Sequence, residues 1–573
     1  MSDEARSAPN PAAGFLAALA KRPVAALFLL CLLAWLPGFS TLPALDRDEA
    51  RFAQASKQMV ETGNLIDIRF GEEARYKKPA GIYWLQAAAT KLLGHPPYTQ
   101  IWTYRLPSLF GAIVAVFLAF WSLRALAPPV TAFVGAALLA LTLGLTAEAH
   151  IAKTDAVLLA SVLGAEGVLL RLYLAARDAA HARPSFALTM AGWAALAIGI
   201  LIKGPVIVAV VGLTALAVSL WDREWRWLGA TRPLPGIVLV LVLVLPWLIA
   251  IGLESHGAFF REALGHDFAG KLVGGQEAHG APPGYYVLLS TLTLWPATLF
   301  VLPGVGAAIA ARKEPALRFL LGWAGASWLM FALVPTKLPN YILPIYPALA
   351  ALAALWLMRD ADGTETRAQT ILRWAACAQF AIGALALAIV TAIAPANYGS
   401  GAPVWLIALA ALGGGIGVGG AVLLFLHARL AALMAAVLCA FIFYPLLTWG
   451  VAPRLTDIWV SPRLAALVAK DKKPDDPPVV AAGYGEPSLV FLLGTETRTV
   501  AGSKAADIAA AYGGLALIEA RQNRDFLNEL GHLRASAVVV DHVTGINYSH
   551  GKPVAITVYR VTRAGLAAKP PVN

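Results

Sequence analysis

Apolar stretches of membrane-spanning length, separated by short polar loops, run along most of the chain. A helix needs about 20 mainly apolar residues to cross a bilayer, and windows of this kind recur about thirteen times. We predict transmembrane helices near residues 24–38, 103–124, 130–149, 155–175, 186–201, 203–220, 235–253, 284–303, 316–334, 341–358, 371–392, 402–426 and 430–449. The pattern indicates a polytopic α-helical membrane protein whose transmembrane part covers residues 1–450.

Two longer polar segments, 39–102 and 254–283, interrupt this series of spans. Within the first segment, residues 49–60 and 82–93 carry apolar side chains at helical spacing but are too short or too polar to span a bilayer. We predict that both stretches form amphipathic helices in the membrane interface. The two polar segments would then cover a cavity at one membrane surface.

The character of the chain changes after Pro453, where charged residues become frequent and apolar runs shorten. Alternation of strand-length apolar runs with helical stretches is typical of an α/β domain. The alternating stretches are 479–482, 504–512, 515–518, 522–534 and 537–540. We therefore predict a small soluble α/β domain in residues 451–573.

Basic residues are concentrated in every second short loop, for example at Arg124, Arg177, Arg223, Arg312, Arg359 and Arg429. The positive-inside rule assigns these loops, and with them the N-terminus, to the cytoplasm. An odd number of helices then places both polar segments and the C-terminal domain on the outer side. The net charge of +11 follows mainly from this topology, so we do not expect a nucleic-acid partner.

Composition excludes other classes of protein. Hydrophobic residues make up 58% of the chain and charged residues only 14%, which is outside the range of ordinary soluble globular domains. The three cysteines, Cys31, Cys377 and Cys439, lie far apart within predicted spans. They indicate buried apolar positions, not a disulfide framework, a zinc knuckle or a catalytic thiol.

Candidate chemistry begins with two carboxylates at the starts of helices on the outer side. Asp48 follows the first span, and Asp155 opens a later one. Ionisable groups at a membrane are costly and are usually functional, so both are candidate catalytic carboxylates. Each also fits a purely structural role, because an acidic residue at a helix start interacts favourably with the helix dipole.

Cationic side chains gather on the same side of the membrane. The sequence Tyr76-Lys77-Lys78-Pro79 lies in the first polar segment, and Lys203 and Lys337 stand at later outer helix ends. Lysine and arginine both bind phosphate well. A single such residue is an ordinary membrane anchor, but several on the side that the positive-inside rule disfavours indicate a phosphate-binding cavity.

The second polar segment contains His256, His266 and His279 among several acidic residues. These are metal-ligand types, but their spacings match no known ligand pattern such as H-E-x-x-H. A solvated loop is the favoured interpretation, and these histidines are only weak candidates for a metal site.

Several motifs together resemble a known family. They are Asp48-Glu49-Ala50-Arg51-Phe52-Ala53, the lysine motif followed by Tyr83-Trp84-Leu85, Lys203-Gly204, and Lys337-Leu338-Pro339-Asn340-Tyr341. In this order, between residues 45 and 350, they resemble the polyprenyl-phosphate-dependent glycosyltransferases of the GT-C type, which are related to protein mannosyltransferases. Within that group the chain looks most like the bacterial transferases that add 4-amino-4-deoxy-L-arabinose to lipid A.

The resemblance implies a GT-C fold and the transfer of a sugar from undecaprenyl phosphate at the outer face of the bacterial inner membrane. By position, Asp48 would be the principal catalytic carboxylate and Asp155 the secondary one. Glu49 and Tyr83 would orient the acceptor or the donor. The side chains expected at the lipid phosphate are Lys78, Arg51, Tyr341, Tyr76, Lys203 and Lys337.

The sequence leaves the acceptor and the metal dependence open. Lys77 stands where many relatives have glutamate, so a possible metal ligand is missing. We therefore predict no required cofactor, with a divalent metal as the alternative. Transfer of aminoarabinose to lipid A is the favoured function, and transfer of a related sugar to protein or glycan is the second. A non-enzymatic lipid-phosphate transporter is the third, but it would carry polar residues through the bilayer midplane, whereas the charges here gather at one face.

Overall fold

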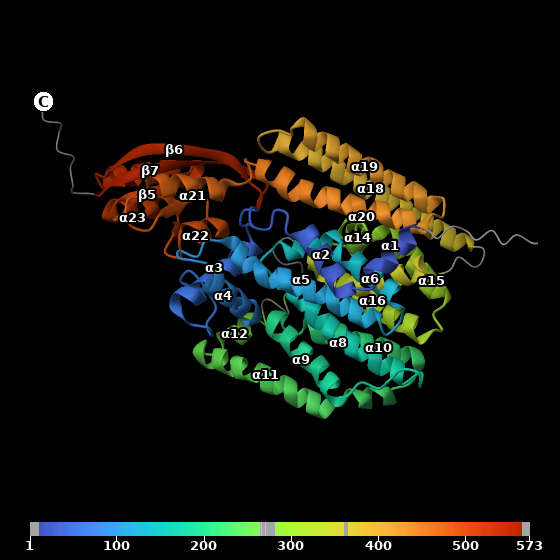
Figure 1. Cartoon of the computed structure of the whole chain (residues 1–573). Coiled ribbons are helices and arrows are strands. Elements are labelled where there is room, and N and C mark those ends of the chain that lie inside the picture. The colour runs from blue at the N-terminus through green and yellow to red at the C-terminus, as the bar shows by residue number, and fades with distance from the viewer. Residues whose placement is uncertain are drawn as a thin grey trace, which may run out of the picture.

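The chain folds into a helical bundle with a smaller mixed α/β domain beside one end of it (Figure 1). This computed structural model describes residues 11–263, 265, 270, 281–282, 284–359 and 365–563. The bundle contains helices α1 (Pro11–Leu19), α2 (Pro23–Trp35), α5 (Ile101–Leu123), α6 (Pro129–Ala140), α7 (Leu143–Ala149), α8 (Asp155–Ala175), α9 (Phe186–Lys203), α10 (Val206–Asp222), α11 (Pro233–Glu254), α12 (Ala258–Phe260), α14 (Tyr285–Thr293), α15 (Thr298–Ala310), α16 (Pro315–Leu333), α17 (Tyr346–Leu357), α18 (Arg367–Asn397), α19 (Val404–Phe425) and α20 (Arg429–Pro445). Short 3-10 or π-helical turns join some of them, namely η1 (Arg226–Thr231), η3 (Pro339–Ile345), η4 (Leu446–Val451) and η5 (Ala452–Arg454).

The protein is a polytopic helical membrane protein, as the sequence predicts. Within the described part of the chain, nine helices are long and apolar enough to cross a membrane, and this number rises to eleven if two bent pairs, α1 with α2 and α6 with α7, each form one span. The predicted count of about thirteen is reached only if the shorter apolar helices α10 and α15 also cross. Their length is the reason for the difference, since neither reaches 18 residues.

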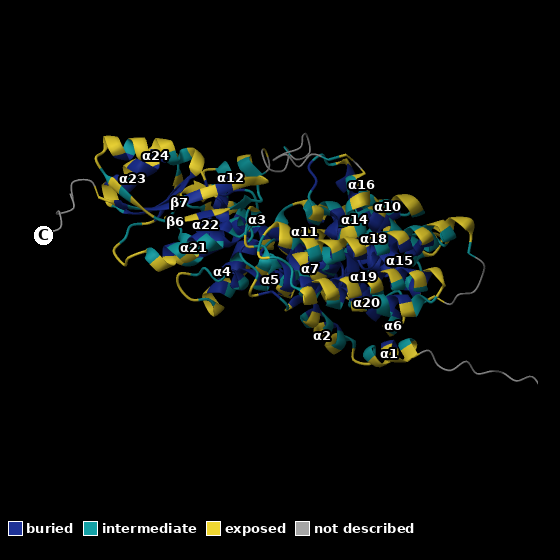
Figure 2. Cartoon of the chain, turned by 90° about the horizontal axis from the view of Figure 1, so that it is seen from above, coloured by how far each residue is buried: buried dark blue, intermediate teal, exposed yellow. Residues whose placement is uncertain are grey.

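Helices long and apolar enough to cross a membrane occupy different places in the bundle. The most apolar window of α8 is 83% buried inside the protein, whereas that of α11 is only 22% buried. A helix that is apolar on all sides must be covered by protein or by lipid. Figure 2 shows exposed residues along α11 and along α19 and α20, so these helices form the lipid-facing wall, and α8 lies in the core with α5 against it.

The first polar segment forms α3 (Asp48–Thr62), a two-stranded turn of β1 (Arg69–Phe70) and β2 (Glu73–Ala74), and α4 (Gly81–Leu93). Residues 49–59 of α3 are buried except for Arg51. The helix packs between α4 and α22 (Pro487–Leu493) of the C-terminal domain. The sequence predicts an interfacial helix here, and the structure instead encloses α3 in protein.

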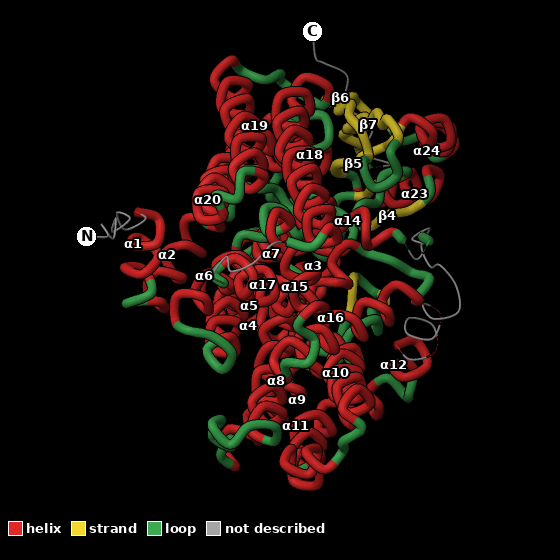
Figure 3. The backbone as a smooth tube through the Cα atoms, turned by 90° about the vertical axis from the view of Figure 1, so that its right-hand side faces the viewer, coloured by secondary structure: helices red, strands yellow, loops and turns green. Residues whose placement is uncertain are grey.

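The C-terminal domain contains a five-stranded mixed sheet in the order β4-β3-β5-β7-β6. Strand β3 (Val480–Ala482) pairs in parallel with β4 (Arg498–Val500) and β5 (Gly514–Glu519), and the long hairpin of β6 (Ser536–Asn547) and β7 (Lys552–Thr562) adds antiparallel strands. One apolar core lies towards α21 (Val460–Asp471) and α22, and a second towards α23 (Gly502–Tyr512) and α24 (Ala520–His532). The predicted α/β domain is therefore confirmed, with β4 and β7 as strands that the sequence pattern did not reveal. Figure 3 shows β5, β6 and β7 close together, with α23 and α24 beside them.

Candidate active site

Asp48 is the first residue of α3, directly after Arg47, whose backbone has φ 64° and ψ −111°. Its side chain is 47% exposed, and its Oδ2 lies 3.9 Å from Lys153 Nζ. Lys153 belongs to the short loop between α7 and α8. The first polar segment and the start of α8 therefore meet at this ion pair.

Lys153 is a central cation among three carboxylates. Besides Asp48, its Nζ lies 3.6 Å from Glu148 Oε1 and 3.9 Å from Asp155 Oδ2. Burial alone lowers the pKa of Lys153, but these carboxylates outweigh burial and raise it above its ordinary value. Lys153 therefore stays charged and offsets repulsion among the three acids.

Asp155 is almost fully buried, with its side chain 3% exposed, and is held on several sides. Its Oδ1 contacts Lys203 Nζ and accepts a hydrogen bond from Asn340 Nδ2 at 2.8 Å. Lys203 Nζ also lies 5.2 Å from the centre of the Tyr341 ring, within the range of a cation–π interaction. The structure thus brings together Asp48, Asp155, Lys203 and Tyr341 from four separate sequence motifs.

A cavity of about 180 Å³ adjoins this cluster. It is lined by Leu143, Gly144, Ala147, Glu148, Thr293, Pro339, Asn340, Leu343 and Tyr346. Glu148 and Asn340 connect it directly to Lys153 and Asp155. The charged cluster therefore opens into space that is otherwise mostly apolar.

Sequence reasoning did not select Glu148, Lys153 or Asn340 for the site. Glu148 carried a usable signal, because an acid within an apolar stretch is expensive unless it has a partner. Lys153 stands two residues before Asp155, and Asn340 lies inside the motif Lys337-Leu338-Pro339-Asn340-Tyr341. Their convergence depends on packing between α7, α8 and η3.

The remaining residues expected at the lipid phosphate have different settings. Arg51 is half-buried one turn after Asp48 on α3, so the two share a helix face. Lys78 is also half-buried, and its Nζ donates to the Lys77 carbonyl at 2.9 Å. Lys337 is buried; its Nζ donates to the Val334 carbonyl at 2.6 Å, and burial lowers its pKa.

Tyr76 is directed into a polar contact of its own. Its hydroxyl donates to Asp67 Oδ1 at 2.7 Å, and its ring packs edge-on against Phe259 at 5.9 Å. Burial first, and this carboxylate second, raise the pKa of Tyr76 to about 12. The hydroxyl therefore stays protonated and orders the loop that carries the lysine motif.

Glu49 has a different place from the one expected for a residue that orients a substrate. It forms an ion pair with Arg105, in which both side chains are at most 1% exposed and Arg105 donates to both carboxylate oxygens at 2.8 Å. Glu49 also accepts from the backbone N–H groups of Leu45 and Ala152 at 2.8 Å. Arg105 donates further to the carbonyls of Phe39, Leu42 and Pro43. Because its oxygens are used within the protein, Glu49 joins the loops before α3 and α8 and does not face a substrate.

Tyr83, the other residue expected to orient a substrate, is also in the core. Its side chain is fully buried in α4, and its ring centre lies 5.3 Å from that of Phe52 on α3. It fixes the packing of α3 against α4.

The histidines do not form a metal site within the described residues. His256 is exposed at the end of α11, while His266 and His279 lie outside the part of the chain that the structure describes. Among the described residues, no group of three or more His, Cys, Asp or Glu side chains has an arrangement that could hold a metal ion.

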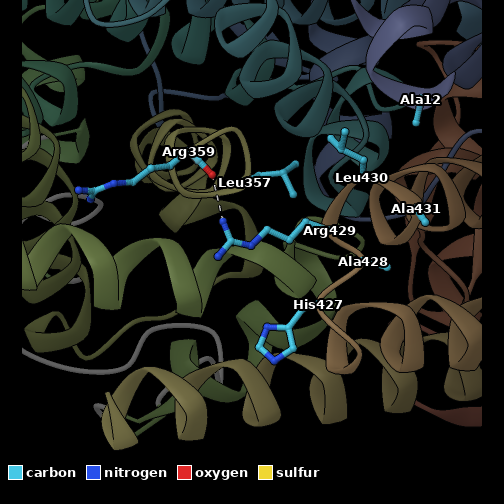
Figure 4. A pocket seen from close by; sticks show the side chains of 8 residues that line it. All are labelled: Ala12, Leu357, Arg359, His427, Ala428, Arg429, Leu430 and Ala431. Carbon is cyan, nitrogen blue, oxygen red and sulfur yellow. Dashed lines mark hydrogen bonds between the residues drawn. The ribbon is translucent and has the colours of Figure 1, made fainter. Parts of the chain in front are cut away.

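A larger cavity, of about 330 Å³, lies at the other end of the bundle at the start of α20 (Figure 4). Arg359 and Arg429 line it, and Arg429 Nη1 donates to the carbonyls of Trp356 and Arg359 at 3.3 and 3.2 Å. The guanidinium also covers the Trp356 ring at 4.4 Å. Arg429 therefore stabilises the end of α17, and this cavity is far from the carboxylates.

Comparison with known proteins finds similarity to the same group of proteins that the motifs resemble. Residues 25–256 match the family of dolichyl-phosphate-mannose-protein mannosyltransferases. The chain is 29% identical over 320 residues to undecaprenyl phosphate-alpha-4-amino-4-deoxy-L-arabinose arabinosyl transferase 2 of Pseudomonas fluorescens, covering 53% of this chain and 54% of that protein. It is also 29% identical over 363 residues to the arabinosyl transferase of Pectobacterium carotovorum subsp. carotovorum, covering 60% of each. The matched part is thus less than two thirds of these relatives.

The fold extends this similarity over nearly the whole chain. The crystal structure of ArnT from Cupriavidus metallidurans bound to undecaprenyl phosphate has a TM-score of 0.72 and 19% identity, covering 93% of this chain and 97% of that one. The same protein in the apo state has a TM-score of 0.70. The predicted resemblance and the GT-C fold are therefore confirmed.

Proposed function

We propose that the protein is a polyprenyl-phosphate-sugar glycosyltransferase that moves 4-amino-4-deoxy-L-arabinose from undecaprenyl phosphate to a phosphate group of lipid A. The observation that carries this proposal is the convergence of Asp48, Lys153, Asp155 and Lys203 beside a mostly apolar cavity. The similarity to arabinosyl transferases supports the choice of sugar.

The donor phosphate needs cations where negative charge develops. The acceptor oxygen attacks the anomeric carbon, the bond from that carbon to the phosphate oxygen breaks, and undecaprenyl phosphate leaves with the electron pair. The transition state resembles an oxocarbenium ion, and cations at the leaving oxygen stabilise it. We assign this role to Arg51 and Lys78, with Tyr341 beside Lys203 at the edge of the phosphate site.

Asp48 is the carboxylate available to a substrate, because its side chain is 47% exposed while that of Asp155 is 3% exposed. A lipid A phosphate is already ionised at neutral pH, so no base is required to activate it. We infer that Asp48 orients the acceptor or stabilises the developing positive charge on the sugar. Asp155 is a positioning residue that holds Lys203 and Asn340.

Mass spectrometry of lipid A tests this proposal. The host lacks its own aminoarabinose transferase but makes the donor, and it expresses this protein or its Asp48→Asn variant. We expect a mass increment equal to aminoarabinose with the wild-type protein, reduced by at least about 10²-fold in the variant. Because Asp48 is half exposed, the variant should fold normally.

Unmodified lipid A from a well-expressed, folded wild-type protein would rule out this acceptor. Modified protein or glycan in the same cells would then identify the related sugar transferase. Donor lipid that crosses the membrane without transfer would identify the transporter.

A further inference from the structure

The C-terminal domain contacts the two residues that precede Asp48. The backbone N–H of Asp46 donates to the Tyr548 hydroxyl at 2.6 Å, and the Ser488 N–H donates to Asp46 Oδ1 at 3.2 Å. Arg47 Nη2 donates to the Ser549 carbonyl at 2.8 Å. The partners are 442 and 502 residues apart in sequence, so only the tertiary fold brings them together.

These contacts hold a strained point of the backbone. Arg47 has φ 64° and ψ −111°, a combination that residues other than glycine rarely adopt. Because Arg47 immediately precedes Asp48, its dihedral angles set the direction in which α3 begins. Relaxation of Arg47 would therefore move the Asp48 carboxylate relative to Lys153.

The contacting turn, residues 547–549 at the end of β6 and the start of its connection to β7, is itself fixed by the C-terminal domain. The buried Glu486 carboxylate accepts from Asn547 Nδ2 at 2.6 Å and from Ser549 Oγ at 3.0 Å. The Tyr548 ring packs edge-on against Trp459 at 6.2 Å. A turn with this many internal contacts can impose a conformation on the segment it touches.

The contacts at Asp46 and Arg47 are not needed merely to attach the C-terminal domain to the bundle, because other residues further along α3 also hold the domain. Lys57 Nζ donates to the Phe491 carbonyl at 3.2 Å, and the buried Phe491 ring packs against Tyr104 at 5.4 Å. Thr495 accepts from Gln54 Nε2 at 2.8 Å and donates to Glu61 at 2.6 Å. Figure 2 shows buried residues where α22 meets α3.

We propose that turn 547–549 and Ser488 are positioning elements for Asp48, acting through Asp46 and Arg47. The inference rests on the proposed function, in which Asp48 meets the substrate. It gives the C-terminal domain an indirect part in catalysis: the first polar segment adopts its active geometry only with the domain in place. Arg51 lies one turn further into α3, and the other residues assigned to the donor phosphate, Lys78, Lys203 and Tyr341, lie outside α3, so the effect belongs mainly to kcat.

The test uses the full-length protein in a transfer assay with the undecaprenyl-linked donor. The double variant Tyr548→Phe with Asp46→Ala removes two contacts while keeping the Tyr548 ring position. We expect kcat to fall by about tenfold to 10²-fold, with the donor KM changed by less than about twofold. Amide hydrogen exchange of residues 44–52 should become faster in this variant.

Two control variants are matched to this test. Thr495→Val removes a contact of the same domain with α3 away from Asp48, and Asp46→Asn keeps an oxygen that accepts from Ser488. Both should stay within about twofold of the wild-type kcat and leave exchange of residues 44–52 unchanged.

Three outcomes would overturn the inference: an equal loss of kcat in Thr495→Val, a loss confined to donor KM, or an unchanged kcat in the double variant. A wild-type protein without transfer activity overturns the proposed function instead. In that case amide exchange of residues 44–52 still tests whether the C-terminal domain holds this segment in place. Faster exchange only in the double variant supports this role, and unchanged exchange overturns it.

Discussion

Lys153 shows how one residue links folding to chemistry in this protein. Its Nζ faces Asp48, Glu148 and Asp155, and its side chain is 13% exposed. Removing one partner of a buried charge cluster leaves the others uncompensated, which costs more than the pair contributed. The same cation lies next to the carboxylate that we assign to the substrate.

We expect Lys153→Met to lower the free energy of unfolding by about 3 kcal/mol and to abolish most of the transfer activity. Thermal unfolding in detergent and the transfer assay measure the two effects. A second variant, Lys153→Met with Glu148→Gln, removes an acid together with the cation. It should recover stability without recovering activity, and a stable, active Lys153→Met protein would contradict this account.

At the scale of elements, the bundle depends on close approaches between apolar helices. Lipid gives little hydrophobic drive for helix association, so small residues let backbones come together. A Cβ added at Gly304 of α15 would lie 2.6 Å from the Leu352 carbonyl oxygen of α17. By contrast, a Cβ at Gly325 of α16 would meet nothing within 4 Å.

Gly304→Ala should therefore separate α15 from α17 and destabilise the protein by about 1–3 kcal/mol. Gly325→Ala is the matched control, and its higher helix propensity should leave stability unchanged or raise it by up to about 1 kcal/mol. Thermal unfolding of the two variants in the same detergent makes the comparison. Equal midpoints would mean that α15 and α17 can separate without cost.

At the scale of the whole molecule, one end of the bundle carries the carboxylates and the C-terminal domain, and the other carries Arg429 and its neighbouring basic loops. The positive-inside rule predicts that the basic end is cytoplasmic. The candidate site would then face the outer side, where the proposed acceptor lies.

Cysteine labelling of spheroplasts tests this orientation. The native Cys31, Cys377 and Cys439 are buried, so they should give little background. A membrane-impermeant maleimide should label Lys504→Cys, whose parent side chain is 65% exposed in the C-terminal domain. It should label Lys313→Cys, at an exposed loop of the basic end, only after the membrane is opened. The reverse pattern would invert the topology.

The sequence by itself determined the membrane-embedded helices, the C-terminal α/β domain and the motifs that contain Asp48, Asp155 and Lys203. These features depend on local length, periodicity and composition, which a single chain displays directly. The sequence pattern did not predict strands β4 and β7, because pairing with neighbouring strands determines whether such segments form strands more than their own residue pattern does.

Only the tertiary structure decided which polar residues meet. It brought Lys153, Glu148 and Asn340 close to Asp155 and paired Glu49 with Arg105. It also placed Tyr548 against Asp46, 502 residues away in sequence. A buried charge takes whichever partner packing brings within reach, because leaving it unpaired is too costly. That choice depends on how helices pack across the whole fold, and no local pattern records it.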